Sequence, residues 1–234
     1  MERRQFLRTC ALAGGATGIS QWLSAATANQ AAKAYPRAKL VDADGQPIKA
    51  ARLLVNRNYL FNYPFAGTPC FLLRLERATA RADLADVDGQ RYAWEGGVGP
   101  RRSIVAYSAI CAHKLAYPAR EITFIRFQEQ ASKTSQGGVI HCCADHSVYD
   151  PAAGARVLSG PAPQPLAAIV LDYDAQQDEL AAVGTLGAEQ FDAFFAKYEF
   201  KLGMDLGAGR AQQPVGSTTA CREMSQVSRQ TVQC

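Results

Sequence analysis

Two short boxes of cysteine and histidine constrain this chain more than any other feature of its sequence. The first box is Cys111-Ala112-His113, and the second is Cys143-Ala144-Asp145-His146, followed directly by Ser147-Val148-Tyr149-Asp150. Thiolates and imidazoles are ligands that proteins use for iron and zinc. We therefore predict one metal centre held between two loops, with four metal ligands: Cys111, His113, Cys143 and His146.

The spacing within the boxes favours an iron–sulfur cluster over zinc. Two Cys and two His suit Zn²⁺ by ligand type, but a C-x-H pair is unusual for a zinc finger. A proline-bearing loop, Gly160 to Leu166, follows the second box. Together the three segments resemble the respiratory Rieske iron–sulfur proteins, in which such a loop covers the cluster.

The resemblance implies one 2Fe–2S cluster, with two Cys on one iron and two His on the other. It also implies roles for the flanking residues. Ser147 and Tyr149 would donate hydrogen bonds to sulfur, and Pro161 and Pro163 would belong to the covering loop. The resemblance is finer to the small subunit of arsenite oxidase, through Phe61-Asn62-Tyr63-Pro64 and Gly97-Val98-Gly99-Pro100.

Two departures from that family concern the second box. The spacer after His113 is longer than usual, with the excess in 128–138. The family also has one more residue before its Ser-x-Tyr/Phe-Asp run, so an ungapped alignment would put Cys142 and Asp145 at the ligand positions. We prefer Cys143 and His146 because they alone satisfy C-x-x-H.

The chain begins like a twin-arginine export signal. Arg3-Arg4 and Phe6-Leu7 precede a mildly apolar, glycine-containing run, and Ala26-Thr27-Ala28 offers a cleavage site. We predict that 1–28 is a signal and that the protein is periplasmic. The same run could instead be retained and associate the protein with the membrane, but it is short for a span of ~20 residues.

Composition excludes some functions. The chain has 234 residues, 48% of them hydrophobic, and a net charge of +4. Half of that charge lies in the predicted signal, so we expect no nucleic-acid partner. A Rieske oxygenase needs a second iron held by two His and a carboxylate. Only His141 remains after the cluster is assigned, and we expect it to face solvent or a neighbouring loop.

Four cysteines outside the predicted signal and cluster have open assignments. The family's inter-loop disulfide would join the positions of Ala116 and Asp145, so that bridge is absent. Cys142 could be a free thiol or pair with Cys70. Cys221 and Cys234 could close a loop in the tail, although sequence alone does not set connectivity.

Short apolar runs separated by turn residues predict an all-β fold. We expect a Rieske-type antiparallel β sandwich with a small cluster-binding subdomain over 35–186. Cys70 to Leu75 reads as a buried strand, and strands near 102–107 and 138–141 deliver the two boxes. Further strands are expected at 167–173 and 180–183. The cluster-binding loops are then 108–118, 141–151 and 159–166.

The region 187–234 has a different character. Over 188–200, four aromatic residues recur at helical spacing, which predicts an amphipathic helix packed on the β-domain: Phe191, Phe194, Phe195 and Tyr198. The Gly, Ser, Thr and Gln content after Gly203 predicts an extended or flexible tail.

These features predict a periplasmic electron-transfer protein with no substrate-converting site of its own. The first interpretation is the small subunit of a molybdenum oxidoreductase of arsenite-oxidase type, with a molybdenum-containing large subunit and a c-type cytochrome as electron acceptor. The second is a Rieske subunit or separate carrier of a quinol-oxidising chain, in which His113 or His146 would bind quinol. The third is a structural zinc module.

Overall fold

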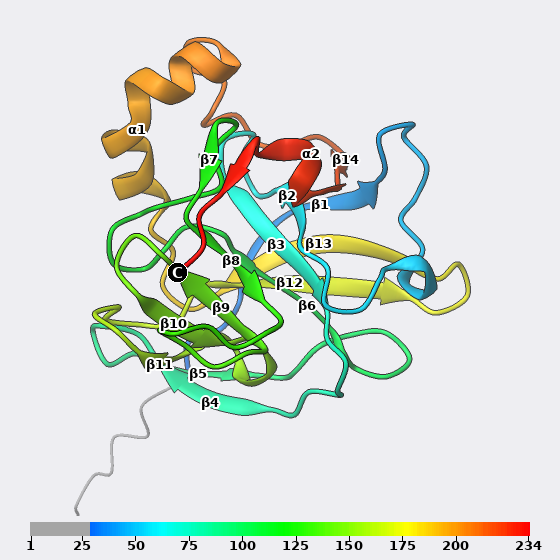
Figure 1. Cartoon of the computed structure of the whole chain (residues 1–234). Helices are drawn as coiled ribbons and strands as arrows, with labels where there is room; N and C mark the ends of the chain where they lie inside the picture. Colours follow the sequence, from blue (N-terminus) through cyan, green and yellow to red (C-terminus); the bar gives the residue numbers. More distant parts are fainter. Residues whose placement is uncertain (1–28) are drawn as a thin grey trace, which may run out of the picture.

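A computed structural model describes residues 29–234, so the predicted signal lies outside the described residues. Its main feature is a sheet of eight strands that nearly closes on itself (Figure 1). In spatial order the strands are β14 (Thr218–Ala220), β1 (Lys33–Val41), β13 (Glu179–Leu186), β12 (Ala168–Asp174), β6 (Ile104–Ser108), β3 (Pro69–Arg74), β2 (Tyr59–Asn62) and β15 (Arg222–Glu223).

A second, antiparallel sheet of four strands carries the second box. Its strands, in spatial order, are β11 (Arg156–Ser159), β10 (Ser147–Asp150), β9 (Val139–Cys142) and β8 (Ile125–Gln128). Two small ladders complete the strands: β4 (Ala82–Ala85) with β5 (Arg91–Trp94), and β7 (Ile122–Thr123) with β16 (Gln230–Thr231). The predicted all-β class and the small cluster-binding subdomain are confirmed.

Alternation along the central strands divides the interior into two cores. In β3, Phe71 and Leu73 enter the core that faces the small sheet, whereas Cys70 and Leu72 enter the core on the other side. Successive side chains of a strand point to opposite faces, so a strand buried on both faces reads as a continuous apolar run. The first core also contains Cys111, and the ligand loops are therefore built on packed scaffold.

Helix α1 (Phe191–Leu206) begins within the predicted range and continues six residues beyond it, with non-helical backbone angles at Tyr198. Phe191, Phe194 and Phe195 are buried, and they pack with Ile110 just ahead of the first box. The predicted packing of the aromatic face on the β-domain is confirmed. Within residues 29–234, no helix is both long and apolar enough to cross a bilayer.

The tail is not extended and flexible, as predicted, but folded onto the β-domain. Strand β14 pairs with β1 and β15 pairs with β2, so six consecutive residues join the two edges of the large sheet. Helix α2 (Met224–Val227) and β16 follow. Two 3-10 turns, Ala50–Arg52 and Pro151–Ala153, complete the elements. The prediction failed because polar residues can pair through their backbone, which composition does not report.

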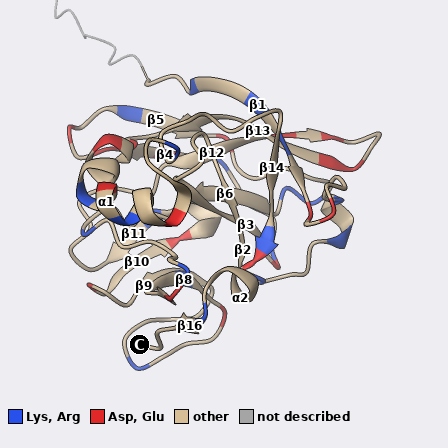
Figure 2. Cartoon of the chain, turned by 90° about the horizontal axis from the view of Figure 1, so that it is seen from above, with Lys and Arg blue, Asp and Glu red and all other residues tan. Residues whose placement is uncertain are grey.

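Charged residues lie mostly on outer loops and strand ends. Figure 2 shows Lys and Arg interspersed with Asp and Glu, and α1 carries both signs. Several of these residues form ion pairs, such as Glu179 with Lys39 and Lys49.

Candidate metal centre

The first box lies on a tight turn that follows β6. The Cys111 N–H donates to the Ala116 carbonyl at 2.8 Å, and the Leu115 N–H donates back to the Cys111 carbonyl at 3.0 Å. Gln190, just before α1, donates its side-chain Nε2 to the Ala112 carbonyl at 2.9 Å. These bonds hold Cys111 in the core while His113 stays at the surface, with its side chain 35% exposed.

The second box forms the turn between β9 and β10. Cys142 and Ser147 are opposite each other in this hairpin, and the His146 N–H donates to the Cys142 carbonyl at 2.7 Å. His146 has a φ of 60°, in the left-handed region that few residues other than glycine adopt. This turn places the Asp145 side chain toward the first box and leaves His146 exposed.

Four side chains from the two turns meet at one point. The ligand atoms of Cys111, Cys142 and Asp145 all lie within 4.8 Å of one another. Asp145 Oδ2 is 3.2 Å from Cys111 Sγ and 3.1 Å from His113 Nδ1. Each turn thus contributes one thiol and one further donor.

This grouping differs from the predicted one at two positions. Cys143 Sγ is bonded to Cys234 Sγ, which makes Cys143 unavailable as a metal ligand in this structure. His146 is exposed, and its ring centroid lies 5.6 Å from that of His141. Cys142 and Asp145, the residues of the ungapped alignment, take the two inner positions because adjacent residues of a strand point to opposite sides.

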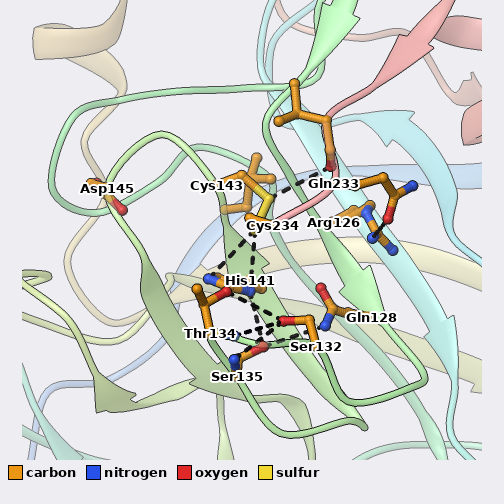
Figure 3. The surroundings of a disulfide bond; sticks show 12 residues. Arg126, Gln128, Ser132, Thr134, Ser135, His141, Cys143, Asp145, Gln233 and Cys234 are labelled. Carbon is orange, nitrogen blue, oxygen red and sulfur yellow. Dashed lines mark hydrogen bonds between the residues drawn. A yellow bond between two sulfur atoms is a disulfide. The ribbon is translucent and has the colours of Figure 1, made fainter.

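The disulfide also corrects the assignment of the other cysteines. Cys234 pairs with Cys143 rather than with Cys221, and the Cα atoms of the pair are 5.6 Å apart (Figure 3). Cys70, Cys142 and Cys221 are buried free thiols in the described part of the chain. The open alternative of a link between Cys142 and Cys70 is therefore not realised.

His141 is fully buried. The expectation of solvent exposure is wrong, and the alternative of a loop contact is correct, because Ser135 Oγ lies 2.9 Å from its Nδ1. Figure 3 shows His141 beneath the disulfide, with Cys234 Sγ 3.4 Å from Nδ1, whereas Asp145 lies away from this group. Burial is the main cause that lowers the pKa of His141.

A search of family models finds no match. Among solved structures, the chain is similar to the soluble domain of the Rieske protein II (soxF) from Sulfolobus acidocaldarius. The two are 30% identical, over 66% of this chain and 82% of that one, with a TM-score of 0.48. The identity over most of that domain carries the assignment.

The chain belongs to the Rieske family. A Rieske fold implies a 2Fe–2S cluster, and the residues present can be tested against such a group. Cys111, Cys142 and His113 fit it, because they provide the two thiolates and one of the two imidazoles. The fourth side chain at this site of the Rieske domain is the carboxylate of Asp145.

The surroundings of the thiols also suit a cluster. Tyr149 is buried, and its hydroxyl oxygen accepts the Ala112 N–H at 3.2 Å while lying 3.4 Å from Cys111 Sγ. Since that oxygen already accepts one bond, its own proton is free to be donated to sulfur. Ser147 Oγ is buried without a hydrogen-bond partner among the described residues. An orphaned hydroxyl at this point fits a group with sulfur acceptors that occupies the site.

The proline-bearing loop 160–166 also packs against the second box. The turn of Pro161-Ala162-Pro163 presents both prolines to solvent, and Ala162 packs toward the core that contains Cys111. Gly160, at the start of this loop, lies against the second box and has a φ of 89°. A Cβ at this glycine would lie 2.4 Å from the His146 carbonyl oxygen.

Hydrogen bonds favour the ionised forms of Cys111 and Asp145 in this Rieske site, but the protonated form of Cys142. The pKa of Cys111 is lowered, chiefly by a hydrogen bond from Cys142 and in addition by Tyr149, while the pKa of Cys142 is raised by the same pair interaction. Burial alone would raise the pKa of Asp145, but hydrogen bonds from Ser147, Cys111 and Cys142 lower it overall. Thiolates and carboxylates are the forms that bind metal.

Asp145 is the residue that the preferred sequence alignment missed. The signal that could have found it was the run Ser147 to Asp150, which aligns with the family without a gap. The C-x-x-H pattern was preferred because it requires a histidine as the last ligand, and the ungapped alignment places Asp145 there instead.

Proposed function

We propose that this Rieske protein carries single electrons in the periplasm as the small subunit of a molybdenum oxidoreductase of arsenite-oxidase type. Its electrons would come from a molybdenum-containing large subunit and leave to a c-type cytochrome. The periplasmic location rests on the twin-arginine pattern in 1–28, which lies outside the described residues. The choice of partners rests on the resemblance of the sequence alone.

The proposal of electron transfer is supported by the position of the four candidate ligand side chains, the donor set, between the core and the surface. Cys111 and Cys142 are completely buried, whereas the His113 side chain is 35% exposed. A bound 2Fe–2S cluster stores one electron, and ligation by imidazole gives it a higher potential than ligation by four thiolates. His113 would be the ligand through which a docked partner exchanges that electron.

The surface around His113 is suited to docking. His113 borders a pocket whose other walls include Tyr35, Phe65, Leu115 and Phe191. Lys33, Glu189 and Asp192 also line this pocket, so a docked partner would meet apolar and charged groups side by side. The start of α1 is fixed beside it, since Gln190 holds the first box through the Ala112 carbonyl.

The exposed imidazole also supports a second candidate. In a quinol-oxidising chain, His113 would accept a hydrogen bond from a quinol hydroxyl. His146, the other residue considered for this role, is exposed but does not contact the donor set. The quinol interpretation therefore depends on His113.

Metal content and electron transfer test the proposal together. The purified protein should be red-brown, with about two irons and acid-labile sulfide per chain. On reduction it should give the low-average-g EPR signal that the resemblance implies. Rapid mixing of the reduced protein with an oxidised c-type cytochrome should reduce the cytochrome. A colourless protein with one zinc would contradict the proposal and favour the structural zinc module.

The two electron donors are distinguished by a second measurement. The oxidised protein is mixed either with a short-chain quinol or with arsenite and the molybdenum-containing subunit. Faster reduction by the second mixture supports the oxidoreductase, and faster reduction by quinol supports the quinol-oxidising chain.

A further inference from the structure

We propose that Asp145 is the fourth protein ligand of the cluster, so that Cys111, Cys142, His113 and Asp145 hold it in place of two cysteines and two histidines. This inference rests on the proposed function, since it assumes that the site holds iron and sulfide. It assigns the metal-binding role to a carboxylate where the Rieske pattern has an imidazole.

The Asp145 side chain is built into the site. It is 1% exposed, although it comes from the tip of a hairpin turn. Its Oδ1 accepts the Ser147 N–H at 2.9 Å, which fixes the plane of the carboxylate. Oδ2 is thereby directed at Cys111 Sγ and His113 Nδ1, at 3.2 and 3.1 Å.

Metal binding changes the partners of this oxygen. In the structure, Oδ2 accepts protons from the Cys111 thiol and the His113 ring. Both residues must release those protons when they become ligands. Oδ2, the thiolate sulfur and the imidazole nitrogen would then be three acceptor atoms close together, with no donor among them. A buried carboxylate oxygen without a donor is energetically costly. Metal cations bound between these three atoms remove that cost.

The distance between Asp145 and His113 is compatible with shared coordination of one iron. The 3.2 Å between Asp145 Oδ2 and Cys111 Sγ would have to widen, because these two residues would bind different irons. Two donor atoms each ~2.0–2.1 Å from one tetrahedral ion are about 3.3 Å apart. The separation of 3.1 Å between Asp145 Oδ2 and His113 Nδ1 is close to this value. Carboxylate and imidazole together are also an established ligand combination for iron.

No other histidine is placed to complete a pair with His113. The chain has three histidines. His141 is buried beneath the disulfide, with Ser135 and Cys234 at its Nδ1. His146 lies on the outer side of the turn, with its ring near His141. For His146 to replace Asp145, the register of the turn would have to shift by one residue.

The competing role for Asp145 is that of a positioning residue. In that case it would orient His113 by accepting its Nδ1 proton, and the metal would bind Nε2. The two roles predict different total numbers of protein ligands, four and three, and different numbers of bound imidazoles in Asp145→His, two and one. As a ligand, the carboxylate adds one negative charge to the cluster and lowers its potential relative to a variant with a neutral imidazole there.

The experiment uses the full-length protein purified with its cluster. Pulsed EPR of the reduced protein, with and without ¹⁵N-labelled histidine, counts the imidazole nitrogens bound to iron. We expect one in the wild type and two in Asp145→His. Asp145→His should retain iron and have a higher potential, whereas Asp145→Ala should lose most of its iron. The matched control, His146→Ala, should keep iron, potential and nitrogen count unchanged.

The outcomes separate the inference from the proposed function. Two bound imidazoles in the wild type, or loss of iron in His146→Ala, would overturn the role of Asp145 and leave the cluster in place. One bound imidazole with full iron content in Asp145→Ala would also exclude the carboxylate. Zinc without iron in the wild type would overturn the proposed function itself. The wild-type count requires no variant and tests the two-imidazole pattern even if Asp145→Ala does not fold. The count in Asp145→His then separates a ligand at position 145, which gives two bound imidazoles, from a positioning residue, which leaves one.

Discussion

Tyr149 shows how one hydroxyl can adjust the redox potential of the site. Its oxygen lies 3.4 Å from Cys111 Sγ and accepts the Ala112 N–H, which leaves its proton for the sulfur. Hydrogen bonds to thiolate stabilise the reduced cluster, because reduction adds negative charge. The bond is charge-assisted and worth roughly 1.5–3 kcal/mol before relaxation.

We predict that Tyr149→Phe retains the cluster and lowers the potential by several tens of millivolts to ~100 mV, since 59 mV corresponds to a tenfold change for one electron. Protein-film voltammetry measures the shift. Tyr107→Phe is the control, because its hydroxyl is also buried and donates to the Pro151 carbonyl at 2.7 Å. Equal potentials in Tyr149→Phe and the wild type would mean that this hydroxyl does not reach the sulfur of the holoprotein.

The Ser147 hydroxyl is expected to affect the potential in the same way. Its Oγ is buried and has no hydrogen-bond partner within residues 29–234. If a cluster sulfur is its acceptor, Ser147→Ala should lower the potential by a similar amount while the metal-free protein changes little in stability. Voltammetry of the holoprotein and thermal unfolding of the metal-free form test this pair of outcomes. A stability loss without a shift in potential would assign the hydroxyl a packing role only.

Among the connecting elements, the loop between β11 and β12 is held against the second box by Gly160. This glycine has a φ of 89°, and a Cβ there would meet the His146 carbonyl oxygen and the Ser147 Cα at 2.4 and 2.6 Å. Real Cβ contacts are not this short, so the loop or the turn must move. The position of this loop against the second box therefore depends on a backbone contact that only glycine permits.

We predict that Gly160→Ala shortens the lifetime of the cluster in air and destabilises the holoprotein. Gly89→Ala is the matched control, since Gly89 has a similar φ of 77° but nothing within 4 Å of its Cβ position. Both variants incur the left-handed backbone cost of ~1–2 kcal/mol. Only Gly160→Ala should accelerate the bleaching of the visible absorption. Equal bleaching rates would show that this loop contact does not protect the cluster.

At the level of the whole molecule, the C-terminal segment 218–234 connects the edges of the large sheet to each other and to the second box. Strands β14 and β15 join the edges of the large sheet, β16 pairs with β7, and the Cys143–Cys234 disulfide links the last residue described to the second box. Arg126 of β8 also bonds Gln233 at 2.6 Å. The disulfide spans 91 residues in sequence, so it restricts a long segment of the unfolded chain.

We predict that Cys143→Ser, Cys234→Ser and the double variant each lower the free energy of unfolding by ~2–4 kcal/mol. The chain-entropy model gives about 4–5 kcal/mol as the upper value for such a loop. Thiol reductant should destabilise the wild type to the same level and leave all three variants unchanged. Thermal unfolding and iron analysis provide the measurements.

Iron content distinguishes this role of Cys143 from metal ligation. All three variants should keep full iron content, because Cys142 supplies the ligand. If Cys143→Ser lost its iron while Cys234→Ser kept it, the original assignment of Cys143 as a ligand would be correct. In that case the disulfide would not exist in the holoprotein.

The sequence alone determined the all-β class, the two turns that carry cysteine and histidine, and the aromatic face of α1. These features follow from local periodicity and from the chemistry of nearby residues, which a linear pattern contains. The roles of Tyr149 and Ser147 beside the site were implied by the resemblance to the respiratory Rieske proteins.

The tertiary structure decided which of two adjacent cysteines faces the first box. Cys142 and Cys143 have the same side chain, so ligand chemistry does not distinguish them. They lie on opposite sides of the strand, because a shift of one residue reverses the side on which a side chain points. The left-handed turn at His146 and a cysteine 91 positions away set the choice. Both depend on contacts between distant segments, and for the same reason the folded tail could not be predicted from its composition.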